Sequence, residues 1–122
     1  MMQPTIIRQD LTGEFPIPEG CRILETWNTG ADESVSIARA RVAPGATTKW
    51  HCLEGIVERY LLVEGRGLVE IGTLEPAEMG PGDLAVIPAG VRQRITNTGP
   101  SDLVFYCICS PRFVPERYRI SE

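Results

Sequence analysis

The sequence predicts an all-β protein, a sandwich or a barrel folded as one domain. Short apolar runs are separated by turn segments rich in glycine and proline, of which the chain has 12 and 10. Such closely spaced strand-like runs are typical of these two architectures. No window sustains an apolar period of 3.6 residues over three turns, which argues against a helical protein. A chain of 122 residues is long enough for one hydrophobic core.

The runs predicted as strands are Thr5–Arg8, Arg22–Trp27, Val35–Val42, Thr47–Leu53, Arg59–Glu64, Gly67–Ile71, Asp83–Ile87, Gln93–Asn97 and Leu103–Cys109. The turn residues between them support this order. Gly65 can adopt positive φ and predicts a tight hairpin between the runs on either side. Pro81 and Gly82 suit the central positions of a type II turn. Pro88 ends the strand that follows, because proline cannot donate to a central ladder.

Charge and composition exclude several classes of function. The net charge is −4 and no basic patch is present, so we expect no nucleic-acid partner. No apolar run approaches the roughly 20 residues of a membrane span, so we expect no membrane partner. The N-terminus lacks a signal-peptide pattern, and we therefore expect a cytoplasmic protein. The cysteines are Cys21, Cys52, Cys107 and Cys109; we expect reduced thiols that pack as small apolar side chains.

Strand alternation brings a few unusual polar side chains onto inward-facing positions. His51 is the only histidine, and it shares a strand face with Leu53. Glu58 shares a face with Tyr60 on the next strand. Gln93 shares a face with apolar neighbours on a later strand, so it is expected to point inward and to need hydrogen-bond partners. We therefore expect His51, Glu58 and Gln93 to converge inside the barrel.

Two segments carry a recognisable spacing. The first is Gly45-ATTKW-His51-C-Leu53-EGIV-Glu58-RYLLVE-Gly65 (45–65), and the second is Gly82-DLAVI-Pro88-A-Gly90-VR-Gln93-RIT-Asn97 (82–97). Together they resemble the two motifs of the cupin superfamily. The resemblance implies a single cupin domain over residues 1–122, folded as a jelly-roll β-barrel, also called a double-stranded β-helix. The tail is similar to that of small cupins resembling mannose-6-phosphate isomerases. Such proteins are often homodimers, and we expect one here.

The resemblance also implies a metal site with unusual ligands. Cupin metals are usually held by three histidines and one glutamate, whose positions correspond here to His51, Leu53, Glu58 and Gln93. Leucine cannot bind a metal, and glutamine offers only a neutral amide oxygen. The implied ligands are thus His51, Glu58 and Gln93. The divalent metal could be Mn, Fe, Ni, Zn or Co, and the sequence does not choose among them.

The function expected from this resemblance is that of a metal-dependent enzyme acting on a small-molecule substrate, sugar isomerase-like or dioxygenase-like. Three alternatives remain open. The first is a metal-free acid–base isomerase or epimerase, with His51 as base, Tyr60 as acid and Glu58 orienting His51. The second is a cupin that binds a small molecule without turnover. In the third, His51 and Glu58 form a buried pair that only stabilises the fold.

Overall fold

The computed structural model describes residues 2–121, which form two antiparallel β-sheets without an α-helix. The larger sheet has the order β1-β2-β3-β10-β5-β8. Its strands are β1 (Phe15–Pro16), β2 (Arg22–Trp27), β3 (Ser36–Val42), β10 (Leu103–Ser110), β5 (Val57–Glu64) and β8 (Leu84–Ile87). Two 3₁₀ turns, η1 (Leu11–Gly13) and η2 (Pro115–Arg117), lie near the chain ends.

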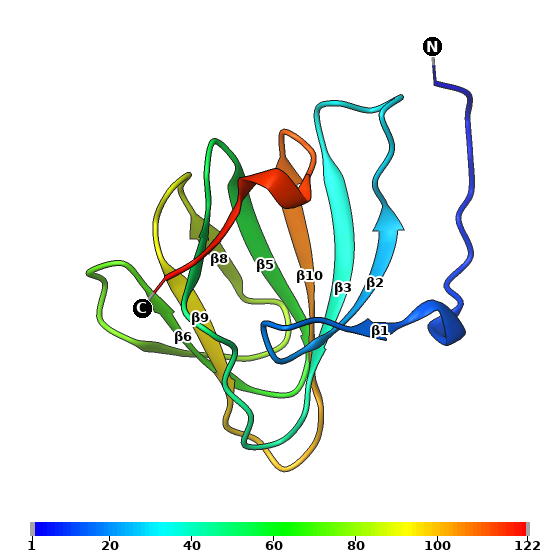
Figure 1. The fold of residues 1–122 in the computed structure, drawn as a ribbon. Helices are drawn as coiled ribbons and strands as arrows, with labels where there is room; N and C mark the ends of the chain where they lie inside the picture. Colours follow the sequence, from blue (N-terminus) through cyan, green and yellow to red (C-terminus); the bar gives the residue numbers. More distant parts are fainter. Residues whose placement is uncertain (1, 122) are drawn as a thin grey trace.

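The second sheet has the order β11-β4-β9-β6-β7. Its strands are β11 (Tyr118–Ile120), β4 (His51–Leu53), β9 (Gln93–Asn97), β6 (Gly67–Ile71) and β7 (Ala77–Met79). The two sheets enclose the interior between them, and the segment after β10 passes across one end (Figure 1). This architecture confirms the all-β jelly-roll fold that the sequence predicts.

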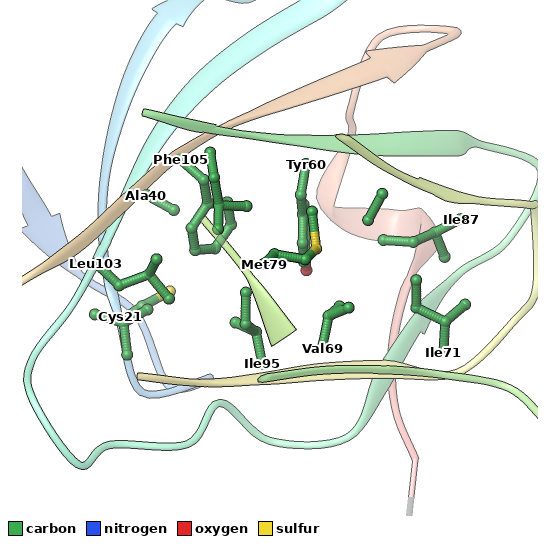
Figure 2. Packing of buried hydrophobic residues seen from close by; sticks show 13 residues of the cluster. Cys21, Ala40, Tyr60, Val69, Ile71, Met79, Ile87, Ile95, Leu103 and Phe105 are labelled. Carbon is green, nitrogen blue, oxygen red and sulfur yellow. The ribbon is translucent and has the colours of Figure 1, made fainter. Parts of the chain in front are cut away.

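The core fills the space between the two layers of strands (Figure 2). Tyr60 from the large sheet packs against Phe105 with ring centroids 4.5 Å apart. Ile95 from the small sheet and Leu103 from the large one are both fully buried in the same cluster. The predicted alternation is confirmed, since buried and less buried positions alternate through Gln93–Asn97 and through Val57–Leu62. Burial of this apolar surface is the main favourable term for folding.

Several sequence predictions need correction. The run Thr5–Arg8 forms no strand and is exposed, with Ile6 78% accessible, because no neighbouring strand pairs with it. The predicted run Thr47–Leu53 shortens to β4, and Thr47 makes only an isolated bridge to Thr96. The short strands β1, β7 and β11 were not predicted.

The turn at Gly65 has the predicted positive φ, at +81°, but the hairpin prediction is wrong. Strand β5 belongs to the large sheet and β6 to the small one, so the turn crosses between sheets. A Cβ at Gly65 would lie 2.6 Å from the carbonyl oxygen of Asp102. This crossing therefore requires glycine both for its backbone angle and for the close approach.

Two remaining expectations concern the membrane and the thiols. Within residues 2–121, no helix has the length and apolar character needed to cross a bilayer. All four cysteines are free thiols; Cys21 and Cys109 are buried as expected, whereas Cys52 and Cys107 are only half-buried. The homodimer stays a prediction.

Candidate functional site

A cavity of about 300 Å³ is lined in part by the C-terminal segment that follows β10. Its walls come mainly from the large sheet and the loop before β2, together with β4 and the tail after β10. The lining residues are Phe15, Ile17, Glu19, Cys21, Ile23, Glu25, Asn28, Ser36, Ile37, Ala38, Ala40, His51, Leu53, Glu58, Tyr60, Phe105, Cys107, Cys109, Phe113, Pro115 and Tyr118. Such a concave, mostly apolar space with a few polar groups is typical of a small-molecule site.

His51 stands at the start of β4 and is 2% exposed. Its Nδ1 lies 2.7 Å from the backbone carbonyl oxygen of Lys49. A carbonyl oxygen can only accept, so Nδ1 carries the proton and donates it to Lys49. The ring stacks on Tyr118 with centroids 5.3 Å apart, which further fixes its orientation. In the neutral ring, Nε2 is therefore the atom with the free lone pair.

The environment keeps this imidazole neutral. Burial lowers the pKa of His51, and the Lys49 carbonyl and the charge of Glu58 only partly oppose that effect. The Nε2 atom lies 3.5 Å from Oε1 of Glu19, close enough to form an ion pair if the ring accepts a proton. His51 thus combines the properties of a general base with a nearby group that stabilises its protonated form.

Glu58 projects from β5 into the same cavity, and its side chain is hydrogen-bonded rather than free. Its Oε1 accepts a 2.9 Å hydrogen bond from Nε2 of Gln93, and Sγ of Cys109 lies 3.8 Å from Oε2. Burial raises the pKa of Glu58 to about 7, and the charge of Glu19 adds to the increase, while His51 and Gln93 oppose it. At neutral pH this carboxyl group can therefore both donate and accept a proton.

Glu19 is a site residue that the sequence analysis missed. It lies in the turn between β1 and β2, and its side chain is 11% exposed. Burial raises the pKa of Glu19 to about 7. Tyr118, on β11, was also missed as a site residue; its hydroxyl is buried beside Glu19 and partly opposes the rise in the pKa of that carboxyl group. Strand periodicity could not find the direction of Glu19, because it lies in a turn.

Of the other two predicted site residues, Tyr60 lies in the cavity wall and Gln93 does not. Tyr60 lines the cavity, and burial raises its pKa well above 10, so its hydroxyl stays protonated. Gln93 is fully buried; its Oε1 has no hydrogen-bond partner while its Nε2 is bound to Glu58. The structure thus brings His51, Glu58 and Tyr60 to one cavity, with Gln93 behind Glu58.

The donors in this cavity fit a resident transition metal poorly. No group of three His, Cys, Asp or Glu side chains within the described chain is arranged around one point. Leu53 lines the cavity where the cupin pattern has its second histidine. Gln93 directs its amide nitrogen, not its oxygen, toward Glu58. Tight Zn or Ni sites use three or four imidazole, thiolate or carboxylate ligands, which this arrangement does not offer.

Comparison with known proteins gives the family. A model of the cupin domain matches residues 38–109. The chain belongs to the cupin family. Among curated proteins, none matches this cupin.

Solved structures resemble this cupin over nearly their whole length. KdgF from Halomonas sp. is 19% identical with a TM-score of 0.77, covering 89% of this chain and 96% of its own. A predicted oxalate decarboxylase from Thermotoga maritima is 21% identical with a TM-score of 0.78, covering 88% and 99%. The nucleoside dehydratase Pac13 is 17% identical with a TM-score of 0.77, covering 97% and 92%. At these identities the likeness shows the shared fold alone.

Proposed function

We propose that this cupin is an enzyme that moves protons on a small molecule held in the barrel cavity, as a lyase or an isomerase does. The observation that supports it is the pairing of a neutral buried imidazole with two carboxyl groups in one cavity. The pKa of each carboxyl group is raised to about 7. General acid–base catalysis is most efficient when the pKa of the catalytic group lies near the working pH.

His51 is the proposed base. The carbonyl of Lys49 holds Nδ1–H, so Nε2 is free to accept a proton from a substrate carbon or hydroxyl group. The imidazolium that forms lies 3.5 Å from Glu19, whose carboxylate stabilises it. The tautomer and the orientation of the ring are thereby set before the substrate binds, which lowers the reorganisation that the reaction needs.

Glu58 is the proposed acid. In its protonated form it can deliver a proton to a leaving hydroxyl group or to a neighbouring carbon. Gln93 holds its Oε1 in place and leaves Oε2 beside the thiol of Cys109. Tyr60 acts as a hydrogen-bond donor to the substrate, because its raised pKa suits it poorly to proton release. Pac13 is described as a nucleoside dehydratase, and loss of water is a reaction that uses such a base and acid together.

The test is proton exchange into a bound substrate. Purified protein, treated with EDTA, is incubated in D₂O with a panel of hydroxylated carbonyl compounds, and deuterium incorporation or loss of water is followed by NMR. We expect turnover by the EDTA-treated protein and a loss of at least about 100-fold in His51→Gln and Glu58→Gln, the usual scale for general acid–base groups.

The matched control is Cys52→Ser, since Cys52 adjoins His51 but projects from the opposite face of β4 and does not line the cavity. Its activity should equal that of the wild type. Activity that EDTA removes and added metal restores would contradict the proposal and favour a metal-dependent enzyme. Binding without any exchange or turnover would instead identify a ligand-binding cupin.

A further inference from the structure

We infer that the substrate of this cavity is uncharged and partly apolar, and that phosphorylated or carboxylated molecules are rejected. This inference rests on the proposed function, which it extends to a class of substrate. Among the described residues, none that lines the cavity is a lysine or an arginine. The ionisable side chains there include three carboxyl groups, on Glu19, Glu25 and Glu58. An anion would therefore meet carboxyl groups and no fixed positive charge.

Three arginines on the wall strands β3 and β5 make their contacts outside the cavity. Arg39 and Arg41 both form ion pairs with Glu14. Arg59 donates through Nη1 to the hydroxyl group of Ser110. None of these three guanidinium groups lines the cavity.

Arg112 does not line the cavity, and it donates a hydrogen bond to one residue that does, Asn28. Its Nη1 donates to Oδ1 of Asn28 over 3.3 Å, and its Nε lies 3.9 Å from Glu33. The Nδ2 atom of Asn28 in turn donates to Glu25 and to the backbone carbonyl of Phe113. The Nη1 and Nε atoms of Arg112 are thus engaged by Asn28 and Glu33, and its guanidinium group does not line the cavity.

Because no cationic side chain within residues 2–121 lines the cavity, uncharged ligands are favoured over anionic ones. A phosphate or carboxylate group entering this apolar space would lose its hydration without gaining a counter-ion, which is strongly unfavourable. An uncharged hydroxyl group can instead donate to Nε2 of His51 or accept from protonated Glu58. The walls formed by Ile17, Phe105 and Phe113 offer apolar surface to the rest of the molecule. The cavity volume of about 300 Å³ suits a ligand with one or two rings.

The experiment compares matched pairs of probes, each an uncharged alcohol and its phosphate ester. The panel includes phenyl β-glucoside with its 6-phosphate and benzyl alcohol with benzyl phosphate, and binding is measured by ligand-detected NMR and calorimetry at pH 7. We expect at least one uncharged member to bind and its ester to bind at least about tenfold more weakly, as expected for an unpaired buried charge. Failure of every uncharged member to bind, or equal binding by an ester, overturns the inference.

A charge-reversal variant tests the cause. Glu25 is an exposed residue at the rim of the cavity, and Glu25→Lys places a cation there. Glu75→Lys makes the same change of net charge at an exposed position outside the cavity. We expect Glu25→Lys to reduce the ratio between the affinity for the alcohol and the affinity for its ester by about tenfold. Glu75→Lys should leave this affinity ratio unchanged. Equal affinity ratios in the two variants overturn the electrostatic explanation.

Glu25→Gln replaces Glu25→Lys as the test if the lysine variant folds poorly, because a glutamine oxygen can still accept the 2.8 Å hydrogen bond from Asn28. Its alcohol-to-ester affinity ratio should lie between those of the wild type and Glu25→Lys. These measurements need no turnover, so absence of proton transfer would contradict the proposed function and leave the charge selectivity intact. Selective binding of phosphate esters would contradict the charge selectivity and leave the proposed proton transfer intact.

Discussion

Replacing Glu58 with glutamine should stabilise this cupin at alkaline pH and leave its stability nearly unchanged at acidic pH. Glu58 is 7% exposed, and its pKa is raised from an ordinary 4.5 to about 7, chiefly by burial. The folded protein therefore binds a proton more tightly than the unfolded chain does. Between pH 4.5 and 7 the folded state holds more protons, so the free energy of unfolding falls as the pH rises.

The size of the effect follows from the difference in pKa. At about 1.4 kcal/mol for each pKa unit, this carboxyl group costs the folded state about 3 kcal/mol above pH 7. Glutamine has the same shape and no charge, and it can still pair with the amide of Gln93. We therefore expect Glu58→Gln to lie within about 1 kcal/mol of the wild type at pH 4.5 and to exceed it by about 2 to 3 kcal/mol at pH 8.

Urea denaturation of both proteins at half-unit steps from pH 4.5 to pH 8 measures this difference directly. The control is Glu75→Gln, an exposed carboxyl group that should give a difference near zero at every pH. The reasoning is refuted if the difference between Glu58→Gln and the wild type does not change with pH. It is also refuted if the wild type gains relative stability as the pH rises, as a carboxylate paired with a fixed cation would.

Three further changes test the turns, the missing ligand and the core. Gly65→Ala should be more destabilising than Gly90→Ala by urea denaturation: both glycines have positive φ, at +81° and +79°, but only Gly65 has a backbone atom within 3 Å of the new Cβ. We expect Gly90→Ala to lower the free energy of unfolding by about 1 to 2 kcal/mol. Equal losses of stability in the two variants would contradict the steric argument. Gln93→His puts an imidazole beside Glu58 and across the strand pair from His51, so Zn²⁺ affinity measured by titration should rise by about tenfold or more. No gain would contradict the expectation that an imidazole at position 93 can bind a metal together with His51 and Glu58. Phe105→Ala removes the ring that packs on Tyr60 and should cost about 3 to 5 kcal/mol of unfolding free energy, with a loss below 1 kcal/mol excluding Phe105 from the tightly packed core.

Local sequence patterns were sufficient for most strands and for the facing of their side chains. The bounds of β2, β6 and β9 coincide with the predicted runs. Alternation correctly turned His51, Glu58 and Gln93 inward, because successive side chains of a strand must point to opposite faces. The motif spacing around these residues led to the cupin family, which the match over residues 38–109 shows.

Patterns within one strand could not assign strands to sheets. The residues around Gly65 are equally suited to a hairpin and to a crossing, and the close approach of Asp102 occurs only in the folded barrel. The apolar run Thr5–Arg8 has the composition of a strand, yet it forms none, because pairing depends on a neighbouring edge that the run itself does not encode.

The sequence by itself determined most of the strands, their inward faces, the family, and the burial of His51 and Glu58 in the interior. The tertiary structure alone decided that Glu19 from a turn and Tyr118 from the tail join them, and that Gln93 binds Glu58. It also decided that burial brings the pKa of both carboxyl groups to about 7. The physical reason is that alternation depends on adjacent residues, whereas distances between remote segments and the exclusion of water depend on closure of the whole barrel.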